Sequence, residues 1–185
     1  MSELRVYSIN NAQPVKIYNK LEDIERELQS IGVGFERWEA KATLDDDASQ
    51  DEVIEAYREP IDRLMQRHGF QSVDVVVMHP DHPNKQAMRE KFLHEHQHSD
   101  FEVRFFVDGS GLFYIRTDDR IYGMLCTKRD LISVPANTRH WFDMGEAPFF
   151  KAIRLFTTAE GWVAQFTGDK VADRFPRFDE VAKAA

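Results

Sequence analysis

Two stretches decide which fold we expect from this chain: residues 96–102, which read HQHSDFE, and residues 135–140, which read PANTRH. Together they supply three imidazoles and one carboxylate, from His96, His98, Glu102 and His140. This mixture of nitrogen and oxygen donors suits iron, nickel, manganese, copper or zinc better than magnesium or calcium. If the four side chains meet, they occupy four positions of one transition-metal ion and leave the remaining positions open for chemistry.

The spacing of these residues is compatible with a single site. Residues two apart in a strand point to the same face, with Cα atoms roughly 6.6 Å apart, so His96 and His98 can converge on one ion. Glu102 and Arg104 share this alternation if the strand continues without a bulge. His140 has to come from a distant strand, presented by the proline-containing loop before it. The alternative, unrelated surface histidines, fits a lone His-x-His better than it fits this longer pattern.

Two arginines are candidates for binding an anionic substrate. Arg104 follows Glu102 by two residues, and Arg154 lies between Ile153 and Leu155 in a strand-like run. An arginine that points into an apolar barrel is costly unless an anion or a carboxylate meets it. We favour substrate binding for Arg104. For Arg154, a salt bridge with an acidic neighbour is an equally good interpretation.

The other histidines and the aromatic residues carry weaker signals. His94 shares the alternation of the motif, but we expect it to be exposed. Phenylalanines near the motifs are core residues by default, and Phe92 and Phe142 are the two that we expect on the wall of the site. The remaining histidines flank helix ends and prolines and are assigned no role: His68, His79 and His82.

Composition excludes several classes of protein. The 185 residues are enough for one domain with a single core. A net charge of −8 argues against a nucleic-acid surface and against a polybasic membrane anchor. We see neither a membrane span nor a signal peptide. The single cysteine, Cys126, cannot form an internal disulfide, which fits a reducing cytosol.

The hydrophobic pattern predicts helices in the first half and short strands in the second. Helices are expected over residues 21–31 (ended by Gly32), 51–68 (interrupted at Pro60 and ended by Gly69) and 84–93. Strands are expected over 33–40, 72–78 (buried), 103–107, 112–116, 121–127, 131–134 and 149–156, with hairpin turns at 108–111 and 118–119. Close spacing of short strands suggests a small barrel or sandwich. We expect Trp162, Phe166, Phe175 and Phe178 to cover part of the core.

The two motifs resemble those of the cupin superfamily, with Asn137 where a glycine is usual. Asparagine tolerates a left-handed backbone, so the turn can survive. More narrowly, residues 95–111 (EHQHSDFEVRFFVDGSG), 130–136 (DLISVPA) and 140–145 (HWFDMG) are similar to the acireductone dioxygenase family. The opening at 33–38 and the ending at 161–169 also resemble bacterial members, so the resemblance covers nearly the whole chain.

The resemblance implies a mainly β cupin (jelly-roll) barrel with flanking helices, as one domain of residues 1–185. A helix-rich part, 1–93, would pack on a barrel core of about 94–160, with a cover from 161–185. It also implies a cytoplasmic monomer of methionine salvage that oxidises 1,2-dihydroxy-3-keto-5-methylthiopentene with O2. With Fe(II) the products would be formate and 4-methylthio-2-oxobutanoate. With Ni(II) they would be methylthiopropionate, formate and carbon monoxide.

By the same resemblance, His96, His98, Glu102 and His140 carry over as ligands of one Fe(II) or Ni(II) ion per chain. Arg104 carries over as the group that helps to form the substrate dianion, and Glu95 matches a position linked to metal loading. Phe101 departs from the family, where aspartate is common. Two other functions stay open: another cupin dioxygenase, acting on a flavonol or a thiol, and a non-catalytic cupin in which zinc staples the fold.

Overall fold

The computed structural model describes residues 1–39, 44–45, 47–158 and 163–185. The helices are α1 (Leu21–Gln29), α2 (Gln50–Ala56), α3 (Arg58–His68), α4 (Lys85–Leu93), α5 (Phe178–Ala184) and the 3-10 helix η1 (Val171–Arg174). The strands are β1 (Glu3–Ser8), β2 (Pro14–Tyr18), β3 (Gly34–Arg37), β4 (Ser72–Met78), β5 (His96–Gln97), β6 (Glu102–Arg116), β7 (Arg120–Thr127), β8 (Asp130–Val134), β9 (Arg139–Asp143), β10 (Phe150–Phe156) and β11 (Gln165–Phe166).

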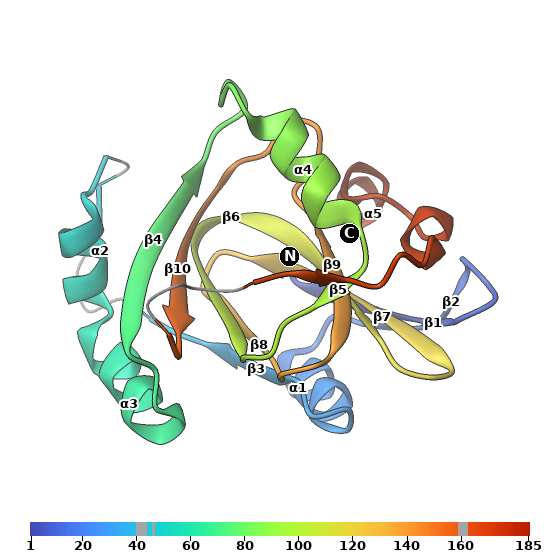
Figure 1. The fold of residues 1–185 in the computed structure, drawn as a ribbon, viewed down its shortest axis with the longest axis horizontal. Helices are drawn as coiled ribbons and strands as arrows, with labels where there is room; N and C mark the ends of the chain where they lie inside the picture. The colour runs from blue at the N-terminus through green and yellow to red at the C-terminus, as the bar shows by residue number, and fades with distance from the viewer. Residues whose placement is uncertain (40–43, 46, 159–162) are drawn as a thin grey trace.

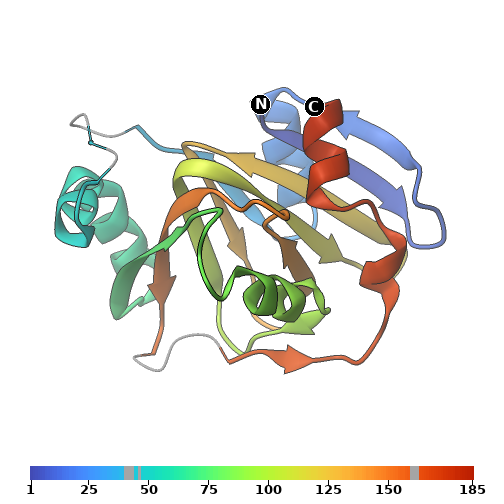
Figure 2. The ribbon, with the colours of Figure 1, turned by 90° about the horizontal axis from the view of Figure 1, so that it is seen from above.

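The strands form two antiparallel sheets that share the long strand β6. One sheet has the order β11-β5-β9-β6-β7-β1-β2. In the other, β6 pairs with β8 and β10, which pair in turn with β3 and β4. The sheets curve around an interior that contains the two motifs, and the helices lie outside them (Figures 1 and 2). Within this interior the two motifs lie side by side, because His96 pairs with His140.

The strand β6 runs through the segment where a hairpin turn was expected. Residues 108–111 lie inside β6, so the predicted turn there is wrong. The strand bends at Gly109 instead. This residue has φ +73°, and a Cβ atom on it would lie 2.0 Å from the carbonyl oxygen of Phe149. Before the bend β6 pairs with β8 and β10, and after it with β7 and β9. The bend thus lets one strand belong to both sheets.

The helices largely follow the predicted pattern. Helix α1 ends at Gln29, two residues before the predicted end, and α3 ends at His68, followed by the predicted Gly69, which has φ +71°. The predicted interruption of the second helix exists, but it lies at Tyr57 rather than at Pro60. Pro60 is in the first turn of α3, where its missing N–H costs nothing. Ser49 begins α2 with a capping box that includes Glu52.

Residues 1–93 contribute strands as well as helices to the barrel. β1 and β2, for which no element was expected, extend the first sheet beyond β7. β4 was expected to be buried, but only Met78 in it is buried, because β4 is an edge strand that pairs with β10 alone. α2 and α3 lie beside β4 (Figure 1).

The C-terminal residues take different positions from one another. Phe175 is buried in a core cluster with Tyr7 and Trp141, and Phe178 packs against the same cluster. Phe166 is 50% exposed and does not belong to the core. The expected role of Trp162 lies outside the described residues. No helix in the described ranges is both long enough and apolar enough to cross a membrane.

Helix α4 is fastened to β9 by a buried ion pair. The Arg89 guanidinium donates to both carboxylate oxygens of Asp143 at 2.8 and 3.2 Å, and Asp143 is 1% exposed. Burial alone would raise the pKa of Asp143, but Arg89 and the backbone N–H groups of Phe178 and Gly145 lower it. The pair therefore holds α4 against β9.

Candidate metal centre and its pocket

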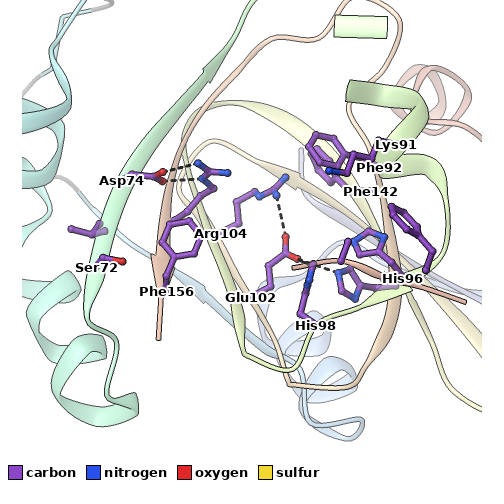
Figure 3. Close-up of a pocket in the computed structure, with 15 residues that line it drawn as sticks. Ser72, Asp74, Lys91, Phe92, His96, His98, Glu102, Arg104, Phe142 and Phe156 are labelled. Atoms are coloured by element: carbon purple, nitrogen blue, oxygen red, sulfur yellow. Dashed lines mark hydrogen bonds and ion pairs between the residues drawn. The ribbon is translucent and has the colours of Figure 1, made fainter. Parts of the chain in front are cut away.

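Four buried side chains converge in the cavity between the sheets (Figure 3). They are His96, His98, Glu102 and His140, with exposed fractions of 5%, 6%, 3% and 2%. Each offers one ligand atom, and these atoms all lie within 4.8 Å of one another. The four residues predicted from the two motifs therefore do form one cluster.

Backbone pairing brings the two motifs together. His96 in β5 pairs with His140 in β9, and β9 pairs in turn with β6. The condition for a shared alternation, an unbroken strand from His96 to Glu102, is not met, because β5 ends at Gln97 and β6 begins only at Glu102. Across this gap, the N–H of Asn137 donates to the carbonyl of His98 at 2.7 Å. Asn137 has φ +60°, so it does adopt the left-handed backbone expected of it.

Each imidazole is oriented by a backbone carbonyl. The Nδ1 atoms of His96 and His140 lie 2.7 Å from the carbonyl oxygens of His94 and Thr138, and Nδ1 of His98 lies 3.1 Å from that of Val163. Donation from Nδ1 leaves Nε2 of each ring as the lone-pair donor for a metal. Burial, and then the neighbouring His140, lower the pKa of His96 to about 4, so this ring is neutral at physiological pH.

Glu102 is the electrostatic centre of the cluster. Burial alone would raise its pKa, but the Arg104 guanidinium, 3.0 Å from Oε1, and the neighbouring histidines hold that pKa well below its usual value. Burial alone would lower the pKa of His98, but its bond to Glu102 raises it. The site therefore contains an ionised carboxylate.

The distances in the cluster fit a transition-metal ion. Nε2 of His98 and Nε2 of His140 lie 3.0 and 3.1 Å from Oε2 of Glu102. Two ligands at right angles, each about 2.1 Å from a metal, are separated by roughly 3.0 Å. Three nitrogens and one carboxylate oxygen are also a donor set that such ions favour. The residues present therefore fit the expected metal.

The cluster forms one wall of a cavity of about 540 Å³. Arg104 lines this cavity, 6% exposed, with its guanidinium carbon 4.4 Å from the ring centre of Phe142 and 5.1 Å from that of Phe113. Phe92 on α4 also lines it, and its ring centre is 6.3 Å from that of Phe142. The cavity combines a metal-binding wall, a buried cation and an aromatic wall.

A family model described as "ARD/ARD' family" matches residues 6–164. The chain belongs to this family. Acireductone dioxygenase of Aquifex aeolicus is 55% identical over 181 residues, covering 98% of each chain. That of Methylococcus capsulatus is 51% identical over 183 residues, covering 99% of this chain and 98% of the relative.

A solved structure, described as acireductone dioxygenase from Bacillus anthracis with cadmium ion in active center, superposes with a TM-score of 0.78. It is 30% identical and covers 90% of this chain and 98% of its own. The expected fold is confirmed: this ARD-family chain is a mainly β cupin with flanking helices.

Arg154 makes the salt bridge with an acidic neighbour that one of its two interpretations expected. It pairs with Asp74 through two bonds of 2.8 and 2.6 Å, and it also lines the cavity, with its guanidinium carbon 5.3 Å from the ring centre of Phe156. The carboxylate explains how an arginine is tolerated at this position of the ARD fold.

Two positions singled out by the family resemblance lie away from the cluster. Glu95 is 1% exposed and pairs with Arg116 at 3.0 Å, and it is not among the four clustered ligands. The half-buried Phe101 packs 5.7 Å from the ring of His68 and does not line the cavity. His94 is exposed, as predicted.

Several cavity residues of this family member were not predicted from the sequence. Ser72 and Asp74 come from β4, Lys91 from α4, and Ala164 and Phe166 from the C-terminal segment. These residues reach the site only through long-range packing. No local motif marks them, although Asp74, an acid in a run of β-branched residues, is a weak signal.

Proposed function

We propose that this chain is an acireductone dioxygenase, which oxidises 1,2-dihydroxy-3-keto-5-methylthiopentene with O2 in methionine salvage. The observation that carries the proposal is the buried three-histidine, one-carboxylate cluster with Arg104 bonded to its carboxylate. The near full-length similarity to curated acireductone dioxygenases supports the choice of substrate.

We assign the cofactor to His96, His98, Glu102 and His140, which would hold one Fe(II) or Ni(II) ion per chain. Such an ion, when bound, would act as a Lewis acid towards the acidic enediol and favour its ionised form. With iron the expected products are formate and 4-methylthio-2-oxobutanoate. With nickel they are methylthiopropionate, formate and carbon monoxide.

Arg104 supplies the fixed positive charge that a substrate dianion needs. Its guanidinium is held between Glu102 and the face of Phe142 on the cavity wall. A cation in this buried position lowers the cost of the second negative charge on the substrate. We assign it the role of stabilising that charge and fixing the orientation of the enediolate.

The aromatic wall is suited to the apolar end of the substrate. Phe92 and Phe142 line the cavity on the side of α4, where a methylthio group can contact ring edges and exclude water. Arg154, held by Asp74, lies on another part of the wall. We assign all three residues to substrate binding, and Glu95 to support of metal loading.

We also propose that the protein is a cytoplasmic monomer that binds small molecules. The family resemblance supports this proposal, and so does Cys126, a buried free thiol with no disulfide partner in this chain.

The test is to reconstitute metal-free protein separately with Fe(II), Ni(II) and Zn(II), and to follow acireductone absorbance, O2 uptake and carbon monoxide. We expect turnover with iron and with nickel, and carbon monoxide only with nickel. O2 uptake only with a flavonol or a thiol would assign the other cupin dioxygenase activity. Zinc binding without O2 uptake under any loading would assign a structural metal.

A further inference from the structure

A short C-terminal segment, residues 163–169, runs along the outer side of the metal centre, and we call it the C-terminal strap. Its strand β11 pairs with β5, so that Gln165 lies opposite Gln97 and Phe166 opposite His96 (Figure 1). Ala164 and Phe166 line the cavity. The strap is therefore part of the wall that encloses the proposed ligands.

The strap also orients one of the ligands. His96 and His140 each bond through Nδ1 to a carbonyl only two residues earlier in their own strand or loop. His98 differs, because its Nδ1 bonds to the carbonyl of Val163, 65 residues later in the chain. The orientation of His98 thus depends on where the strap lies, whereas that of the other two histidines is set locally.

The buried carboxylate of Glu95 helps to hold the strap, in addition to the pairing of β11 with β5. Thr167 donates its hydroxyl to Oε1 of Glu95 at 2.7 Å, and its backbone N–H donates to the carbonyl of Glu95 at 3.1 Å. Arg116 bonds to both carboxylate oxygens of Glu95 at 3.1 and 3.0 Å and to Asp169 in the strap at 2.8 Å. Bonds to a charged acceptor are stronger than neutral ones, so this arrangement holds the strap at two of its residues.

The alternation of strand β5 connects this attachment to the metal centre. Glu95 directly precedes His96, and consecutive side chains in an extended chain point in opposite directions. Glu95 therefore faces Arg116 and Thr167, whereas His96 faces the ligand cluster. Burying a carboxylate is costly unless its oxygens are bonded, and here the bonds go to the strap and to the end of β6.

We propose that Thr167, with Glu95 as its acceptor, is a positioning residue for the metal centre. Its hydroxyl bond keeps the strap where the carbonyl of Val163 fixes the His98 ring and Phe166 closes the cavity wall. The role rests on the proposed function, because it requires the four residues to bind a metal. Thr167 touches neither the ligand cluster nor the cavity, so it acts only through the strap.

The test compares Thr167→Val, which removes the hydroxyl but keeps the shape, with Thr167→Ser, which keeps the hydroxyl. The matched control is Thr157→Val, since the buried hydroxyl of Thr157 has no hydrogen-bond partner among the described residues. Thr167 is exposed, so we expect both of its variants to fold. The measurements are Co(II) affinity against a chelator, the Co(II) absorption spectrum, KM and kcat with iron, and the Tm of the metal-free protein.

We expect Thr167→Val to bind Co(II) about tenfold more weakly, the scale seen when an outer partner of a metal ligand is removed. Its Co(II) spectrum should change and its KM should rise, while the Tm of the metal-free protein shifts no more than in Thr157→Val. Thr167→Ser should restore the wild-type values. Wild-type affinity, spectrum and KM in Thr167→Val would overturn the positioning role alone. A wild-type protein that binds no Co(II) would instead overturn the proposed function.

Discussion

The bond between Arg104 and Glu102 joins the metal centre to the substrate cavity at the scale of single residues. Replacing Arg104 by Ala removes the charge that the proposed dianion needs, but it leaves all four ligands in place. We expect unchanged metal content and a loss of about 10²–10³ in kcat, as for other residues that stabilise developing charge. Metal analysis with steady-state kinetics at saturating substrate measures both quantities. Arg104→Lys keeps the positive charge but lacks the planar guanidinium, so we expect its kcat to lie between those of the wild type and Arg104→Ala. Full activity of Arg104→Ala would remove this residue from the mechanism.

The ligand assignment can be tested with two histidines of the same strand region. His96 is buried in the cluster, whereas His94 is exposed two residues earlier and contributes only its carbonyl to the site. We expect His96→Ala to lose stoichiometric metal, because it removes one of the four ligands, and His94→Ala to retain it. Elemental analysis after dialysis against a chelator distinguishes the two. Stoichiometric metal in His96→Ala would contradict the assignment.

The residues of the site differ in how much of their role is visible in the sequence. The four clustered side chains and the left-handed Asn137 were predictable, because two short motifs specify both residue type and local backbone. The carbonyl of Val163 was not, because every residue has a carbonyl and only tertiary packing places this one beside His98. Lys91 on the cavity wall was missed for a similar reason.

The bend in β6 carries the architecture at the scale of secondary-structure elements. Gly109→Ala would place a Cβ atom 2.0 Å from a backbone oxygen and would also strain a left-handed backbone. Because backbone atoms on both sides would have to move, we expect a loss of more than about 3 kcal/mol in the free energy of unfolding. Gly69→Ala is the control, since φ there is +71° but no atom lies within 4 Å of the added Cβ. It should cost about 1–2 kcal/mol from backbone strain alone. Urea denaturation measures both, and equal losses would contradict the steric role of Gly109.

The ion pair that holds α4 on β9 gives stability a dependence on pH. Arg89 keeps the pKa of Asp143 below its usual value of 3.8. The contribution of this ion pair to the free energy of unfolding is therefore complete above the pKa of Asp143 in the unfolded state. It is lost as the pH falls through the lower pKa of the folded state. We expect Asp143→Asn to lower the free energy of unfolding by about 3 kcal/mol at pH 7. The difference in this free energy between the variant and the wild type should become smaller below pH 3.8. Urea denaturation at several pH values tests this. Asp23→Asn, in an exposed pair on α1, should change little at any pH. If the free energy of unfolding of Asp143→Asn differed from that of the wild type by the same amount at every pH, the role given to the Arg89–Asp143 ion pair would be contradicted.

Most elements that the sequence predicted have either a helical repeat or a run of apolar residues. α1 and α3 were recovered because their apolar residues repeat at helical spacing, and β4, β7 and β10 because each is a run of mainly apolar residues. β5 and β11 have two residues each, which is too short for any periodicity, and they exist only through pairing, β11 with β5 and β5 with β9. The bend of β6 was mistaken for a turn because Asp and Gly residues give the same local signal in both.

The strands at the scale of the whole molecule mix early and late parts of the chain. β1 pairs with β7, β3 with β8, and β4 with β10, so three strands from residues 1–93 are bonded to the barrel. The proposed metal ligands come from β5, β6, β9 and the loop after β5, which draws both sheets together at one point. Both features favour the proposal that the chain is one domain, since neither part could separate without breaking strand pairs.

Two tryptophans in different core clusters can test this cooperativity. Trp38 stacks on Phe105 near α2 and α3, and Trp141 stacks on Tyr114 in the cluster that contains Phe175. We consider two proteins, each of which retains one of these tryptophans and has the others replaced by phenylalanine. In each protein we expect tryptophan fluorescence and circular dichroism to give the same unfolding midpoint. For each protein, the unfolding midpoint from fluorescence is compared with the midpoint from circular dichroism of the same protein. Destabilisation by the replacements therefore does not affect the comparison.

Adding metal makes the same test sharper. A ligand that binds only the folded state at 1,000 times its Kd stabilises it by about 4 kcal/mol. For a chain of this length that is a Tm increase of roughly 8–16 °C, and we expect Ni(II) to raise the midpoint at Trp38 as much as at Trp141. An increase confined to Trp141 would mean that the part of the molecule around α2 and α3 unfolds separately. In that case strand pairing through β4 would be too weak to couple it to the metal centre, and the single-domain proposal would be wrong.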